Sequence, residues 1–121
     1  MSKVLFLDDR QKRVEVAKER YKDDELTIVQ TVEDAISALS SESWWDFVCL
    51  DHDLNYEEGV DSNRPDCGME VVRWMVAYLG PLNKIAKNVI VHSSNLYAAL
   101  EMYSALRTRG YYVLYERFRY E

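Results

Sequence analysis

The sequence predicts one α/β domain in which helices cover both faces of a parallel β-sheet. Three short apolar runs, at 4–7, 47–50 and 89–91, are continuous rather than alternating, as in strands that are buried on both faces. Segments with the 3.6-residue period of amphipathic helices separate these runs. A length of 121 residues fits one hydrophobic core, so a single domain is expected over residues 1–121.

Five strands and four helices are expected to alternate along the chain. The apolar runs form the central strands, and two more polar segments suit the flanking strands. In chain order, the expected elements are strand 3–8, helix 11–22, strand 26–30, helix 32–41, strand 46–51, helix 68–79, strand 88–92, helix 95–108 and strand 111–117. Strict alternation implies right-handed crossovers and a doubly wound sheet.

The helices carry local start and stop signals. Two of them place apolar residues at i, i+3, i+4 and i+7, so each is expected to bury one stripe. Thr31, three residues before Asp34, resembles a capping box. Gly110 follows the last expected helix, and the pair Gly80-Pro81 ends the one before it.

Composition and charge exclude several classes of function. The net charge of −6 and the pI near 4.9 leave no global positive field for duplex DNA. No stretch approaches the ~20 apolar residues that span a bilayer, and no signal-peptide pattern is present, so a cytoplasmic protein without membrane association is expected. Cys49 and Cys67 show neither metal-site nor disulfide spacing. A small phosphorylated ligand remains compatible, because a local cation, a metal or a helix N-terminus can attract it.

Polar side chains gather where three of the expected strands end, which is where doubly wound sheets bind ligands. The three strand ends are Asp8-Asp9-Arg10, Asp51-His52-Asp53 and His92-Ser93-Ser94-Asn95. Singly, such aspartates and histidines are more often structural, but their convergence on one edge favours a functional site. The acidic connection 55–67 has no periodicity and is long for a compact domain, as functional loops often are.

These residues resemble the acidic pocket of response-regulator receiver domains, over nearly the whole chain. The resemblance implies a flavodoxin-like or CheY-like three-layer sandwich, with a five-stranded parallel sheet in the order 2-1-3-4-5 and without the last helix. In that family the aspartate pair, Asp8 and Asp9 in this sequence, binds Mg²⁺, and the aspartate at Asp51 accepts a phosphoryl group. A hydroxyl at the Ser93 position senses that group, and a basic residue of the last strand, Arg117 by position, contacts it.

The two histidines depart from ordinary receivers, because one follows the phosphoacceptor position and the other precedes the hydroxyl. With them, the chain is similar to a divergent subgroup, the cyclic-phosphate-processing receiver domains. The motifs that carry this similarity are Leu50-Asp51-His52-Asp53-Leu54 and His92-Ser93-x-Asn95. The function proposed for that subgroup, from its paired histidines, is the opening of cyclic phosphates. The sequence departs from it at Leu96-Tyr97, where a Pro-containing turn is expected.

Opening a cyclic phosphodiester needs a base for the attacking water, an acid for the departing sugar oxygen, and stabilisation of the phosphate charge. His52 and His92 are the expected acid and base, in an order that the sequence leaves open. Asp51 or Asp53 would orient the His52 ring and raise its pKa, and all four residues are therefore expected to be catalytic.

The carboxylates are also expected metal ligands. Asp8, Asp9 and Asp51 form an oxygen-rich set that suits Mg²⁺ or Mn²⁺, and an imidazole would extend it. The residues expected to bind substrate are Arg10, Ser93, Asn95 and Arg117. The two arginines fit surface ion pairs equally well.

The expected function is a phosphoesterase acting on a 2′,3′-cyclic RNA end or a cyclic nucleotide, with a small phosphorylated ligand or an RNA terminus as partner. One alternative is a signalling receiver phosphorylated on Asp51. Another is a non-catalytic nucleotide-binding protein with the acidic loop as a lid. A third takes the aromatic residues from Tyr111 to Tyr120 as a partner-binding edge, although such aromatics ordinarily pack against helices.

Overall fold

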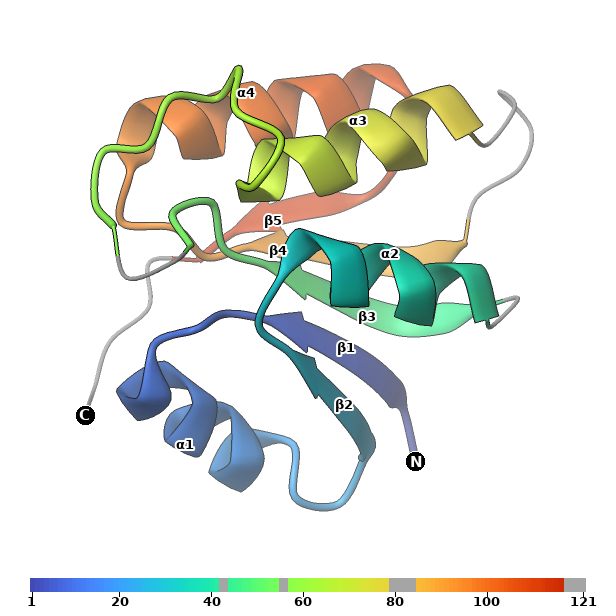
Figure 1. The fold of residues 1–121 in the computed structure, drawn as a ribbon. Helices are drawn as coiled ribbons and strands as arrows, with labels where there is room; N and C mark the ends of the chain where they lie inside the picture. The colour runs from blue at the N-terminus through green and yellow to red at the C-terminus, as the bar shows by residue number, and fades with distance from the viewer. Residues whose placement is uncertain (42–43, 55–56, 79–84, 117–121) are drawn as a thin grey trace.

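A computed structural model of the chain contains a parallel five-stranded sheet with helices on both faces (Figure 1). The structure describes residues 1–41, 44–54, 57–78 and 85–116. The strands are β1 (Lys3–Leu7), β2 (Glu25–Val29), β3 (Trp45–Leu50), β4 (Ala86–Val91) and β5 (Val113–Tyr115). The helices are α1 (Gln11–Arg20), α2 (Val32–Ser41), α3 (Gly68–Tyr78) and α4 (Leu96–Thr108). The strand order is β2-β1-β3-β4-β5, which confirms the expected fold class and topology.

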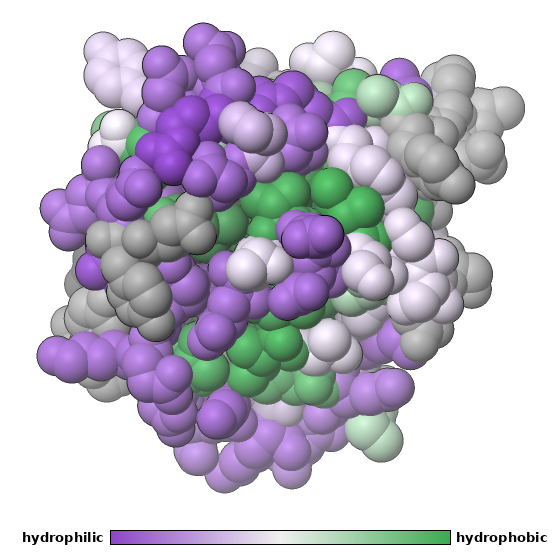
Figure 2. Space-filling view, viewed as in Figure 1, coloured by the Kyte–Doolittle hydropathy of each residue, from purple (hydrophilic) through white to green (hydrophobic). Residues whose placement is uncertain are grey.

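Two hydrophobic layers hold the sheet between its helices. The larger layer packs one face of the sheet against α2, α3 and α4, and the smaller one packs the other face against α1. Successive side chains of a strand point to opposite faces, so β1 sends Leu5 and Leu7 into the larger layer and Val4 and Phe6 into the smaller one. This two-sided burial explains why the central strands have continuous apolar sequences. On the face that Figure 2 shows, polar residues surround apolar areas near the centre of the view.

The local signals at the helix ends act as expected. The side-chain oxygen of Thr31 accepts a hydrogen bond from the backbone N–H of Asp34 at 3.1 Å. Gly110 follows α4 with φ of 96°, a left-handed conformation that glycine adopts without steric cost. The helix end expected at Gly80-Pro81 lies outside the described residues. Among the helices that the structure describes, none is long and apolar enough to cross a membrane.

Candidate functional site

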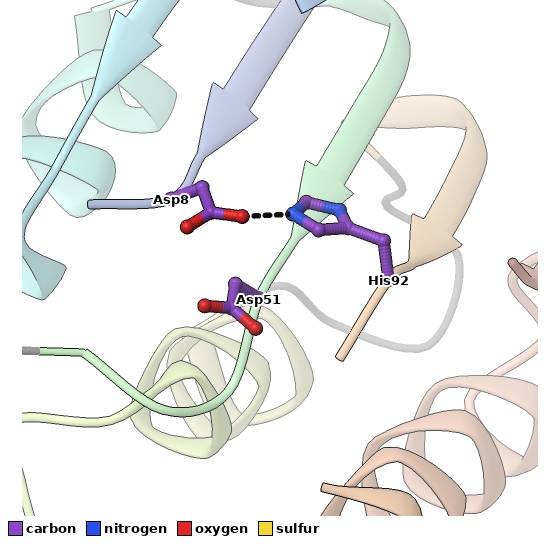
Figure 3. A group of neighbouring side chains, drawn as sticks. All are labelled: Asp8, Asp51 and His92. Atoms are coloured by element: carbon purple, nitrogen blue, oxygen red, sulfur yellow. Dashed lines mark hydrogen bonds and ion pairs between the residues drawn. The ribbon is translucent and has the colours of Figure 1, made fainter. Parts of the chain in front are cut away.

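Three buried polar side chains converge at the carboxyl edge of the sheet, on the face that α1 covers. Asp8, Asp51 and His92 directly follow β1, β3 and β4, which are neighbours in the sheet. The register pairs the last residue of each of these strands with that of its neighbour, so the residues that follow lie in one row. One potential ligand atom of each residue lies within 4.8 Å of the others (Figure 3). We call this group the Asp8–Asp51–His92 cluster.

The ring of His92 is fixed between a carboxylate and an aromatic ring. Its Nε2 lies 3.1 Å from Oδ2 of Asp8, and the ring stacks on Phe6 with 4.7 Å between centroids. Burial lowers the pKa of His92, and the charge of Asp8 only partly offsets that effect. Burial raises the pKa of Asp8, but the hydrogen bond and charge of His92, the backbone N–H of Arg10 and the charge of Arg13 together lower that pKa overall. A neutral imidazole beside an ionised carboxylate is therefore expected at neutral pH.

Asp51 is a buried carboxylate with a raised pKa. Its side chain is 1% exposed, and neither oxygen accepts a hydrogen bond within ordinary limits from the described residues. Burial, and then the charge of Asp8, raise the pKa of Asp51 well above its usual value. A divalent cation fits this arrangement, because it would compensate both carboxylates and accept an imidazole as a further ligand. Asp9, the third expected metal ligand, is also buried, but it is not one of the three residues whose ligand atoms converge among those described.

Arg13 is a component of the site that the sequence analysis missed. Its Nη1 lies 3.4 Å from Oδ2 of Asp8 and 3.4 Å from Oδ2 of Asp51. The position of Arg13 in the sequence could have indicated this role. Helix α1 begins directly after Asp8-Asp9-Arg10, so its first turn lies over the end of β1. A guanidinium that contacts both carboxylates is well placed to meet phosphate oxygens.

His52 belongs to a different group of side chains. Its Nδ1 lies 2.7 Å from Oδ1 of Asp53, and its Nε2 lies 3.1 Å from the hydroxyl of Ser62. That hydroxyl also donates to Glu101 of α4 at 3.0 Å. Burial lowers the pKa of His52, but the contacts with Cys67 and Asp53 outweigh it and raise the pKa overall. Ser62 and Cys67 had no role in the sequence analysis, because nothing in their local sequence marks them.

The two histidines therefore lie in separate clusters. The alternation of side chains along β3 continues past its end, so Asp51 faces α1 while His52 faces α4. His92 bonds to Asp8, and His52 bonds to Asp53. The expectation that both imidazoles flank one phosphorus atom does not match this geometry.

Two of the expected substrate-binding residues serve the fold. The side-chain oxygen of Asn95 caps α4 by accepting from the N–H of Ala98 at 3.3 Å, and its amide nitrogen donates to Asp53 at 3.1 Å. The hydroxyl of Ser93 accepts from the N–H of Asn95 at 3.0 Å. These bonds fix the turn that carries His92 out of β4.

Of the two expected phosphate-binding arginines, the structure describes Arg10, whose guanidinium forms an ion pair outside the cluster. The guanidinium of Arg10 lies 3.6 Å from the exposed carboxylate of Glu58, as a surface ion pair. Its backbone N–H, however, donates to Asp8 at 2.9 Å and so helps to keep that carboxylate ionised. Arg117 lies outside the described residues.

Gly68 lets α3 begin directly against the site. Its N–H donates to the carbonyl of His52 at 2.9 Å, and a Cβ at this position would lie 1.8 Å from the carbonyl oxygen of Asp51. Only glycine fits so close to the backbone that carries both side chains.

Gly68→Ala is expected to lower the free energy of unfolding by about 1–3 kcal/mol, because the added methyl group must displace backbone. Gly59→Ala is the matched control, since Gly59 has φ of 62° but no atom within 4 Å of the point that a Cβ would occupy. Its cost should be limited to the left-handed conformation, about 1–2 kcal/mol. Urea unfolding of both variants measures the difference, and equal stability of Gly68→Ala and wild type would contradict this packing.

The fold and the buried carboxylates that follow β1 and β3 define a domain of the receiver type. The crystal structure of a signal receiver domain from Vibrio parahaemolyticus is similar to it, with a TM-score of 0.63 and 20% sequence identity over 98% of this chain and 81% of that one. A family model, the cyclic-phosphate processing receiver domain, matches residues 3–108. The chain therefore belongs to the cyclic-phosphate processing receiver domain family. No curated protein matches the sequence significantly.

Proposed function

We propose that the protein is a phosphoesterase that opens cyclic phosphodiesters at the Asp8–Asp51–His92 cluster. The observation that carries this proposal is the convergence of two buried carboxylates and one buried imidazole within 4.8 Å, at the edge of the sheet where such folds bind ligands. Membership of a family described as processing cyclic phosphates supports the choice of substrate.

Asp8 and Asp51 would hold Mg²⁺ or Mn²⁺. When bound, such a cation supplies charge neutralisation for the phosphate oxygens and for the departing sugar oxygen. Arg13 would bind a non-bridging phosphate oxygen, since its guanidinium already faces both carboxylates.

His92 would be the general base. Its lowered pKa keeps the ring neutral at pH 7, and Asp8 fixes its orientation through Nε2. The ring nitrogen that does not face Asp8 would take a proton from water as the water oxygen bonds to phosphorus. The bond from phosphorus to one sugar oxygen then breaks, that oxygen takes a proton from solvent, and a terminal monophosphate remains. This route needs one histidine at the site rather than two.

The test is turnover of a panel that contains 2′,3′-cyclic-ended RNA, 2′,3′-cyclic nucleotides and 3′,5′-cyclic nucleotides, with Mn²⁺ or Mg²⁺ present. Release of a terminal monophosphate from at least one substrate, and its loss with a chelator, is the expected result. Absence of turnover across the whole panel with both cations would refute the proposal.

A second candidate function is phosphoryl acceptance by Asp51, as in signalling receivers. The placement of its carboxylate beside Asp8 and Arg13 favours this candidate. We nevertheless expect no stoichiometric adduct after incubation with acetyl phosphate and Mg²⁺, because His52 and the long loop that follow Asp51 alter the surroundings that a phosphodonor must enter. Intact-mass measurement decides the matter. A phosphoryl adduct that disappears in Asp51→Asn would make the signalling function the better one.

A further inference from the structure

A chain of hydrogen bonds lies on the opposite face of the sheet edge, and the proposed hydrolysis does not use it. The hydroxyl of Ser62 lies 3.1 Å from Nε2 of His52, whose Nδ1 lies 2.7 Å from Oδ1 of Asp53. A hydroxyl, an imidazole and a carboxylate in this order are the nucleophile, base and orienting acid of hydrolytic serine sites. Such sites are recognised by geometry rather than by sequence order.

Each member of this chain is held by partners of its own. Oδ2 of Asp53 accepts the N–H of Gly59 at 2.7 Å, while Oδ1 accepts the side-chain amide of Asn95. The carbonyl of Ser62 accepts Nη1 of Arg73, from α3, at 2.6 Å. The loop that carries Ser62 is therefore fixed to the helix layer, which is the preorganisation that a catalytic group requires.

Solvent exposure increases along this series of hydrogen-bonded side chains, from the carboxylate and the imidazole to the hydroxyl, as catalysis requires. His52 and Asp53 are buried, whereas Ser62 is partly exposed. A small electrophile can therefore reach the hydroxyl, while bulk water is kept from the base and the orienting acid.

We propose that Ser62 is a nucleophile for small activated esters, with His52 as its general base and Asp53 as the residue that orients His52. When the His52 ring is neutral, the Ser62 oxygen bonds to the carbonyl carbon, and the Ser62 proton passes to Nε2 of His52 and then to the departing alcohol as the carbon–oxygen ester bond breaks. Water hydrolyses the acyl-serine and returns the hydroxyl. This activity is independent of the proposed phosphoesterase, because it uses neither Asp8 nor His92.

Glu101 provides a diagnostic feature of this site. The Ser62 hydroxyl hydrogen has two acceptors within reach, Nε2 of His52 and Oε1 of Glu101, at 3.1 and 3.0 Å. A hydroxyl that donates to Glu101 does not give its proton to His52. Glu101→Gln weakens the competing acceptor, so it should raise the reactivity of Ser62. Damage to the fold would lower it instead.

The experiment is reaction of the full chain with a small fluorophosphonate in the presence of a chelator, so that the metal cluster takes no part. The Ser62 oxygen would bond to phosphorus as fluoride leaves, and intact mass followed by peptide mapping would show one adduct on Ser62. Ser62→Ala should abolish labelling, and His52→Asn should slow it by about 10²–10⁴-fold, the usual contribution of a general base. Glu101→Gln should accelerate it.

Ser104→Ala is the matched control, because Ser104 is an exposed serine on α4 outside both clusters. In this variant, Ser62 should be labelled at the wild-type rate. Thermal unfolding of each variant separates a lost nucleophile from a lost fold. Absence of labelling in wild type, labelling that persists in Ser62→Ala, or an equal rate in folded His52→Asn would each overturn the proposal. None of these outcomes bears on cyclic phosphate turnover, which is measured with metal and a different substrate.

Discussion

His92→Ala is expected to slow cyclic phosphate hydrolysis by about 10²–10⁴-fold, the contribution that a general base typically makes. The ring is neutral because burial lowers its pKa, and Asp8 and Phe6 fix its orientation. The measurement is kcat/KM with a 2′,3′-cyclic nucleotide and Mn²⁺. His92→Gln, which keeps a polar side chain at this position, should show the same loss if the variants are folded.

His52→Ala tests whether hydrolysis uses both histidines or His92 alone. Two paired histidines would make both substitutions equally damaging, and that was the expectation from sequence. Because the structure attaches His52 to Asp53 and Ser62 on the other face, we expect the His92 variant to lose far more activity. Equal losses would restore the two-histidine mechanism. Recovery of His92→Ala at high Mn²⁺ would instead identify His92 as a metal ligand.

Asp51→Asn is expected to abolish both hydrolysis and the stabilisation of the fold by Mn²⁺. At a free concentration of 100 times Kd, a bound cation should raise the unfolding free energy of wild type by about 2.7 kcal/mol. The variant should gain much less, because one of two converging carboxylates is gone. Asp23→Asn, which removes an exposed carboxylate after α1, should respond to Mn²⁺ like wild type.

The same substitution should stabilise the metal-free protein at pH 7. Burial and Asp8 raise the pKa of Asp51 in the folded chain, so the native state binds more protons than the unfolded state between the two pKa values. The contribution of Asp51 to the free energy of unfolding of wild type therefore falls as pH rises above about 3.9, the ordinary aspartate pKa. The Asp51→Asn variant lacks this loss of stability, because an amide does not ionise. Urea unfolding in chelator at pH 5 and 7 checks this expectation, and a variant less stable than wild type at pH 7 would contradict the raised pKa of Asp51.

The candidate site could be located from the sequence only to one edge of the sheet. Asp8, Asp51 and His92 were predicted there because each follows an apolar run, and the carboxyl ends of parallel strands meet at the same edge. Arg13 was not predicted, because a helical arginine has no local feature that distinguishes a site residue from a surface one. Asn95 was assigned to substrate, since the residue type alone does not separate a helix cap from a ligand contact.

The sequence by itself determined the α/β class and the elements, because the spacing of apolar residues reflects strand burial and helix periodicity. The strand order was implied by the resemblance to receiver domains. Only the tertiary structure decided which polar residues act together. Adjacent residues at the end of a strand point to opposite faces of the sheet. Asp51 therefore joins Asp8 and His92 beneath α1, while His52 joins Asp53 and Ser62 beneath α4.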